Sequence, residues 1–108
     1  MRIDDYQKMA LETANYPKDY RVIYPALCMA GEAGEVADKV KKIIRDNDGK
    51  LDDEQKLELV KEIGDVLWAC ATLAHDLGYP LSEAAQINYD KLSDRARRGV
   101  LGGSGDNR

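Results

Sequence analysis

Apolar residues recur at intervals of three or four positions along most of this chain, which is the spacing of amphipathic α-helices. Turn-forming residues interrupt the pattern at three places, namely Pro17, the run Asp46–Gly49 and the run Gly78–Pro80. Between these interruptions the pattern predicts four helices. They cover about residues 5–15, 25–45, 53–77 and 82–98. The sequence therefore predicts an all-α fold.

Local signals support the ends of these helices. Pro25 suits a first helical turn, because its fixed φ is helical and no N–H is lost from the ladder there. Asp52 is a good N-cap for the third helix, and its carboxylate would accept a backbone N–H of the first turn. Gly78 can adopt the left-handed conformation that ends this helix.

The second and third helices are joined by a short turn, so we expect a long antiparallel hairpin with flanking helices. Each of the two carries a coiled-coil-like seam, with apolar residues at alternating spacings of three and four. The seams consist of Ala26, Ala30, Ala33, Ala37, Val40 and Ile44 on the second helix, and Val60, Ile63, Leu67, Cys70, Ala74 and Leu77 on the third. Small residues in the first seam allow a partner helix to approach closely. Because a narrow hairpin buries little surface alone, we expect a homodimer or homotetramer that completes a four-helix-bundle core.

Composition narrows the class of protein further. The chain has 108 residues, of which 6% are aromatic and none is Phe, so its core must be built from Leu, Ile, Val and Ala. The net charge of −4 argues against a nucleic-acid partner. No apolar stretch approaches the roughly 20 residues that a membrane span needs, and the first residues lack the apolar stretch of a signal peptide. We expect a cytoplasmic protein with one domain over residues 1–98 and a flexible, glycine-rich tail over residues 99–108.

Four acidic residues form two pairs with i, i+3 spacing, Glu32 with Glu35 and Glu62 with Asp65. On a helix, both members of such a pair lie on one face. The midpoint between residues 35 and 62 coincides with that between 32 and 65, and it falls between Asp48 and Gly49 in the expected turn. An antiparallel hairpin that bends there brings all four carboxylates to one level.

Four carboxylates that meet in this way need a counter-charge. At ~4 Å in a partly buried site, each pair of like charges costs on the order of 4 kcal/mol. Either their pKa values rise, or cations hold them together. The alternative is that these side chains do not converge and are solvated charges on a helix face. The coincidence of register and the small neighbours Gly31, Ala33 and Gly34 favour a metal site. An all-oxygen ligand set suits Mg²⁺, Mn²⁺ or Ca²⁺.

Two stretches of the chain resemble a known family. The run 31–42 reads GEAGEVADKVKK and the run 62–68 reads EIGDVLW. Together they resemble the MazG-like family of all-α nucleoside triphosphate pyrophosphohydrolases, which carries E-x-x-E, a helical linker and then E-x-x-D. Asn88-x-x-Lys91 with Arg95, and the ending 102–108, resemble the small single-domain members, many of which are encoded by phages.

The resemblance implies Mg²⁺-dependent hydrolysis, with Mn²⁺ as a possible substitute, of (deoxy)nucleoside triphosphates between the α and β phosphates. The products would be a nucleoside monophosphate and pyrophosphate. The metal ligands would be Glu32, Glu35, Glu62 and Asp65. One of these acids would take a proton from the attacking water, and we assign this role to Glu35. Many relatives have a further acid at the position of Gly31, so this chain lacks one candidate base.

Further residues are candidates for substrate binding. Lys39 lies one turn beyond Glu35, so it either reaches a phosphate or pairs with Glu35 at i, i+4. Trp68 follows Asp65 by three residues and either stacks on a nucleobase or fills the core. The resemblance implies that three residues on one face of the last helix contact the substrate, although composition alone would make them surface residues. These are Asn88, Lys91 and Arg95.

Two other functions are compatible with the same residues. The chain could be a non-catalytic module that holds a metal–nucleotide complex, or a structural helical oligomer whose acids face solvent. Release of pyrophosphate from a panel of triphosphates separates the enzyme from the binding module. Titration with Mn²⁺ identifies the structural oligomer, because solvated acids give no saturable site.

Overall fold

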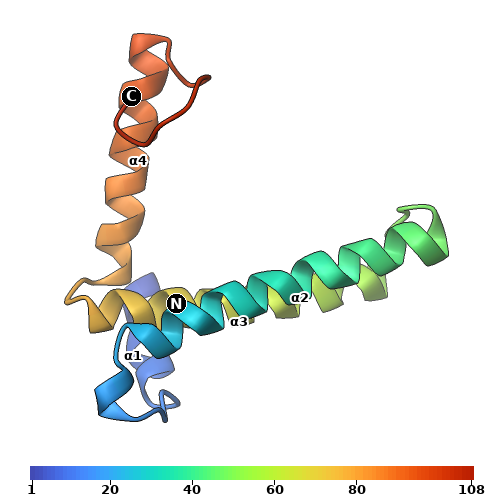
Figure 1. Ribbon diagram of the computed structural model, residues 1–108, viewed down its shortest axis with the longest axis horizontal. Helices are drawn as coiled ribbons and strands as arrows, with labels where there is room; N and C mark the ends of the chain where they lie inside the picture. Colours follow the sequence, from blue (N-terminus) through green and yellow to red (C-terminus); the bar gives the residue numbers. More distant parts are fainter.

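The computed structural model describes residues 1–108 and is built from helices alone, as the apolar spacing predicts. Four α-helices and one short 3₁₀ helix follow one another along the chain (Figure 1). They are α1 (Ile3–Leu11), η1 (Lys18–Tyr20), α2 (Ile23–Asn47), α3 (Asp53–Asp76) and α4 (Leu81–Arg98). None of these helices combines the length and the hydropathy that a bilayer span needs.

The third helix begins and ends at the residues that its local signals predict. The Asp52 carboxylate accepts the backbone N–H of Gln55 at 2.7 Å, and the Gln55 side chain accepts the N–H of Asp52 at 3.0 Å. This reciprocal capping box satisfies two N–H groups that a helix start leaves without partners. Gly78, with φ +86°, follows the last turn in the conformation that glycine adopts most readily.

The first two α-helices differ from the expected boundaries. α1 ends at Leu11 rather than near Asn15, because the N–H groups of residues 12–14 donate to carbonyls three residues back instead of four. The Thr13 hydroxyl also donates to the Ala10 carbonyl, at 2.9 Å. α2 begins before Pro25, at Ile23, directly after Val22 with φ +69°. The Asp76 carboxylate holds this start by accepting the N–H of Val22 at 2.9 Å.

α2 and α3 form the expected antiparallel hairpin (Figure 1). At the end of the hairpin opposite the turn, α1 lies against α3, and α4 projects away from the hairpin. The result is an open shape of 43 × 42 × 27 Å. The Cα radius of gyration is 16.6 Å, whereas a compact chain of this length has about 13 Å. A single chain therefore leaves much of its helix surface uncovered.

The core is small and lies where α1, α3 and the start of α4 meet. It consists of Ala10, Ala71, Ala74 and Leu81. Gln7 of α1 ties these elements together through its buried side-chain amide. Its Nε2 donates to the carbonyls of Ala71 at 3.0 Å and Tyr79 at 3.2 Å, and its Oε1 accepts the N–H of Leu81 at 3.0 Å. This side chain therefore links α1 to the end of α3 and to the start of α4.

The predicted apolar seams do not line the contact between α2 and α3. All six seam residues of α2 are exposed, from Ala26 to Ile44. On α3, Val60 and Ile63 are each 58% exposed, and only Ala74, near the other end of the seam, is buried. Apart from Asp38, the less exposed residues of α2 follow a second line along the helix, which consists of Pro25, Cys28, Met29, Glu32, Val36, Lys39 and Ile43. The hairpin thus closes on this second line and leaves the small-residue seam uncovered.

Candidate metal centre

Three carboxylates meet across the middle of the hairpin. Glu32 comes from α2, and Glu62 and Asp65 come from adjacent turns of α3. One oxygen from each lies within 4.8 Å of the other two. We call these three residues the acidic cluster. The antiparallel register places residue 32 level with residue 65, and the i, i+3 spacing places residue 62 on the same face.

The fourth predicted acid, Glu35, is not part of this cluster. The structure leaves it exposed on α2 and does not place its carboxylate with the other three. Residues 32, 36 and 39 follow the line of α2 that faces α3, whereas residue 35 is rotated off that line. The structure therefore brings three of the four predicted carboxylates together, and Glu35 lies at the edge of the group, where its charge contributes to the raised pKa of Glu32.

Burial and the neighbouring carboxylates both disfavour the ionised form of Glu32. The pKa of Glu32 is raised, first by desolvation and then by the charges of Asp65, Glu62 and Glu35. Each cause disfavours the ionised form of Glu32. A divalent cation among these oxygens would reverse the balance, because its charge stabilises all the carboxylates together. The donor set contains oxygen alone, which fits Mg²⁺ or Mn²⁺.

Lys39 already supplies one positive charge at the cluster. Its Nζ lies 2.7 Å from the Glu62 carboxylate and 3.5 Å from that of Glu58, both across the hairpin. These contacts raise the pKa of Lys39, with the hydrogen bond to Glu62 as the largest cause. The alternative that Lys39 pairs with Glu35 along its own helix is wrong, because Lys39 lies on the line that faces α3.

Trp68 lies one turn beyond Asp65 on α3 and is half-buried. Its indole Nε1 donates to the Thr13 hydroxyl at 2.7 Å, which anchors one edge of the ring to the segment after α1. The ring also packs against the small core formed by α1, α3 and the start of α4. The structure thus places an anchored aromatic ring next to the acidic cluster, with part of its surface open.

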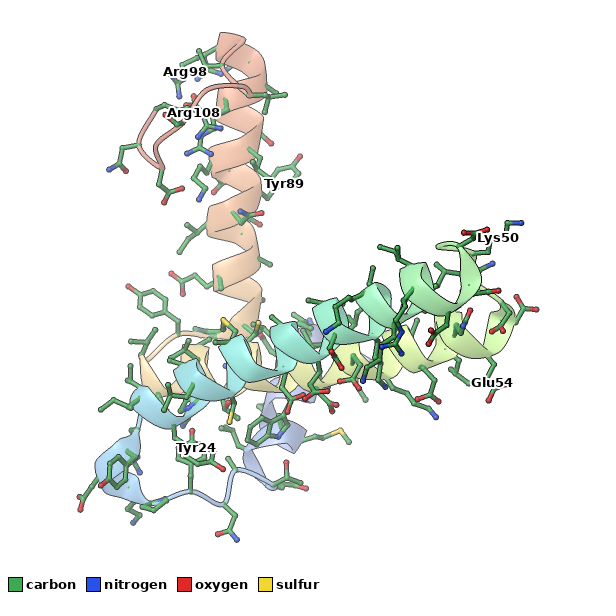
Figure 2. All side chains as sticks on the ribbon, turned by 45° about the vertical axis from the view of Figure 1, so that its right-hand side comes forward. Tyr24, Lys50, Glu54, Tyr89, Arg98 and Arg108 are labelled. Atoms are coloured by element: carbon green, nitrogen blue, oxygen red, sulfur yellow. The ribbon has the colours of Figure 1, made fainter.

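The three predicted binding residues of α4 do not join the acidic cluster within one chain. Asn88 is exposed, and Lys91 and Arg95 lie toward the far end of the projecting helix. Figure 2 shows the labelled Arg98 and Arg108 at this end, well away from the hairpin. A single chain therefore separates the acids of α2 and α3 from the cations of α4.

Sequence reasoning missed the partner that Lys91 and Arg95 have in the structure. Asp106, in the tail of residues 99–108, places its carboxylate 2.7 Å from the Lys91 Nζ and 3.4 Å from the Arg95 Nη2. The glycines of the tail, which allow the chain to turn back on α4, are the only signal for this contact in the sequence.

Comparisons with known proteins identify a matching family and a similar protein. The family model described as "MazG nucleotide pyrophosphohydrolase domain" matches residues 25–100, which span α2 from Pro25 onward and all of α3 and α4. The chain is also similar to the "Gene 37 protein" of Mycobacterium phage L5, at 46% identity over 114 residues that cover 100% of both chains. No solved structure matches the chain significantly.

Proposed function

Because this chain belongs to the MazG nucleotide pyrophosphohydrolase family, we propose that it hydrolyses nucleoside triphosphates between the α and β phosphates. The products are a nucleoside monophosphate and pyrophosphate, and the reaction depends on Mg²⁺. The observation that carries this proposal is the acidic cluster, in which two helices bring three carboxylate oxygens within 4.8 Å of one another.

The residues of the cluster fit a bound metal ion. Glu32, Glu62 and Asp65 would hold Mg²⁺ through their carboxylate oxygens, and together they supply the negative charge that a divalent ion requires. When bound, Mg²⁺ offsets the charge of the triphosphate, polarises the α-phosphoryl group and lowers the pKa of a coordinated water. The carboxylates fix where this chemistry takes place.

Glu35 is our candidate for the proton acceptor. It lies at the edge of the cluster, close enough for its charge to raise the pKa of Glu32, but its carboxylate is exposed and outside the group of three. A carboxylate in this position is free to accept a proton from water that attacks the α-phosphorus. The other acids are then left to orient the metal and the substrate.

Lys39 and Trp68 complete the substrate contacts of the hairpin. The Lys39 Nζ, which is held by Glu62 and Glu58, can turn to a phosphate oxygen once a cation replaces it beside Glu62. Trp68 has an edge fixed by Thr13 and a partly open face, and we assign this face to stacking on the nucleobase.

We propose that the functional form of the protein is a homo-oligomer, with a dimer as its smallest form. The exposed seam of α2 and the exposed residues Val60 and Ile63 of α3 form an apolar face that a second hairpin would cover as a four-helix bundle. A second copy would also bring its own α4 toward the acidic cluster. Asn88, Lys91 and Arg95 would then contact the phosphates from the partner chain.

The test measures release of pyrophosphate in Mg²⁺ from a panel of canonical, deoxy and modified triphosphates. We expect turnover by the unchanged protein and a loss of about a hundredfold or more in Glu32→Gln, Glu62→Gln and Asp65→Asn, each of which removes a metal ligand. Glu54→Gln is the matched control, because Glu54 is an exposed acid at the tip of the hairpin (Figure 2).

The possible results distinguish the three functions. Normal turnover in all the cluster variants would contradict the proposed site. Triphosphate binding that depends on Mg²⁺, without turnover for any nucleotide, would identify a binding module instead. If the protein bound neither metal nor nucleotide, a structural helical oligomer would remain.

A further inference from the structure

Arg95 is buried although it lies on the helix that projects away from the rest of the chain. Only 6% of the residue is exposed. The tail produces this burial, because residues 99–108 fold back along α4 and cover the guanidinium group. The Arg95 Nη2 donates to the backbone carbonyls of Gly105, at 3.4 Å, and Asp106. It also lies 3.4 Å from the Asp106 carboxylate.

The same carboxylate is bound by a second cation. Asp106 Oδ1 accepts a hydrogen bond from the Lys91 Nζ at 2.7 Å. Lys91 and Arg95 are separated by four residues and therefore project from one face of α4. The ammonium and guanidinium groups thus converge on one anionic group, and their charges lower the pKa of Asp106, with Lys91 as the larger cause.

The tail is a closed loop with its own internal hydrogen bonds. The Arg108 guanidinium donates to the carbonyls of Leu101, Gly102 and Gly105 at 2.9, 2.8 and 2.6 Å. Gly103 and Gly105 both have φ +89°, which side chains other than glycine rarely adopt. Asp106 is therefore presented to Lys91 and Arg95 by a shaped loop.

A lysine and an arginine that share one anion form a binding site for phosphate as well as for carboxylate. We propose that Lys91 and Arg95 form a site for a phosphate group of the triphosphate or of pyrophosphate, and that Asp106 occupies this site as an internal competitor. The proposal rests on the proposed function, in which Lys91 and Arg95 contact the phosphates. The tail must release these two side chains before a phosphate group binds to them.

Competition of this kind lowers the apparent affinity for phosphate ligands, because only the fraction of molecules with the tail released can bind. The carboxylate of Asp106 is fully charged at neutral pH, so a change that removes its charge should open the site. The guanidinium of Arg95 would then exchange one anionic partner for another, without the cost of leaving it buried and unpaired.

The test is calorimetric titration of the full chain with inorganic pyrophosphate, without divalent metal. We expect Asp106→Asn to bind pyrophosphate roughly threefold to tenfold more tightly than the unchanged protein. A gain of this size corresponds to the free energy of one partly exposed ion pair, which the ligand no longer has to break. Asp94→Asn is the matched control, because Asp94 lies on the same helix and its carboxylate pairs with Arg97 and Arg98. It makes the same change in net charge and should bind pyrophosphate as the unchanged protein does.

Two further variants test whether Lys91 binds the phosphate group and whether the charge of Asp106 is what competes with it. Lys91→Gln, combined with Asp106→Asn, should remove the gain in affinity. Asp106→Glu keeps the carboxylate and should bind within about twofold of the unchanged protein. Equal affinity of Asp106→Asn and the unchanged protein would overturn the proposal, and so would an equal gain in Asp94→Asn.

The result is separable from that of the proposed function. If the protein releases pyrophosphate from triphosphates but Asp106→Asn shows no gain in affinity, the competition by the tail is wrong and the enzymatic function stands. If Asp106→Asn gains affinity but no triphosphate is hydrolysed, the anion site stands and the enzymatic function is wrong.

Discussion

Gln7 links α1 to α3 and to the start of α4, and the substitution Gln7→Ala tests how much this link stabilises the fold. The side chain is 7% exposed and makes three hydrogen bonds, two to carbonyls and one to a backbone N–H. The Ala71 carbonyl lies inside α3, so it keeps a helical partner after the substitution. The Tyr79 carbonyl and the Leu81 N–H lie at the connection between α3 and α4, where each loses its Gln7 partner.

The magnitude follows from these two groups. A buried backbone group that loses its partner costs about 1 to 3 kcal/mol, so we expect Gln7→Ala to lower the free energy of unfolding by about 3 kcal/mol. With a urea m-value of about 1.5 to 3 kcal/mol/M for a domain of this size, the midpoint falls by roughly 1 to 2 M. The assay is urea unfolding followed by far-UV circular dichroism at constant protein concentration.

The control is Gln86→Ala. Gln86 is exposed on α4 and donates to Asp90 at 2.8 Å, so its loss should change the free energy of unfolding by less than about 0.5 kcal/mol. If Gln7→Ala unfolds at the same urea concentration as this control, the Gln7 amide does not hold α1, α3 and α4 together as the structure indicates.

Three further predictions address the apolar face, the start of α4 and the acidic cluster. Ile63→Asp should convert the proposed homo-oligomer to a monomer in sedimentation, because it places a charge on the apolar face, whereas Leu101→Asp in the tail should not. The hydrogen bonds from Ser82 lower the pKa of Asp4 below its ordinary value. Asp4 therefore stabilises the fold above the ordinary pKa of an aspartate, and this contribution disappears as pH falls through the lowered pKa. The difference in unfolding free energy between Asp4→Asn and the unchanged protein should therefore shrink on acidification, and a constant difference would refute this role. Without divalent ions, Glu32→Gln should raise the melting temperature, because it removes a carboxylate whose ionised form is disfavoured at this site. The same variant should also lose the stabilisation by Mg²⁺. An unchanged response to Mg²⁺ would show that Glu32 is not a ligand.

The helices could be predicted from the sequence because the signals that begin and end them are local. The capping box of Asp52 and Gln55 depends on residues three positions apart, and Gly78 ends α3 through its own φ angle. The position of the turn between α2 and α3 then sets the register of the hairpin. This is why residues 32 and 65, which are far apart in the sequence, could be placed opposite each other.

The rotation of α2 about its axis could not be predicted in the same way. This helix carries two lines with spacings of three and four, one through the exposed Ala30 and Ala37 and the other through Glu32, Val36 and Ile43. Periodicity alone does not say which line faces α3. The choice of the second line places Glu35 at the edge of the acidic cluster and leaves the small-residue seam exposed.

The direction of α4 and the fold of the tail depend on contacts between distant parts of the chain. Gln7 bonds to residues more than 60 positions away, and no local pattern marks it as a core residue. The burial of Arg95 likewise depends on a glycine-rich segment that folds back on the helix. The sequence pattern identifies Lys91 and Arg95 as candidate binding residues, but only the three-dimensional structure shows that Asp106 is their partner.

The most direct test of the acidic cluster is calorimetric titration with Mn²⁺ in the absence of nucleotide. We predict a saturable site in the unchanged protein that is lost in both Glu32→Gln of α2 and Asp65→Asn of α3, and is retained in Glu54→Gln at the hairpin tip. Loss in both cluster variants would show that the two helices hold one ion between them. A protein without a saturable site, or with a site that both cluster variants keep, would contradict the account.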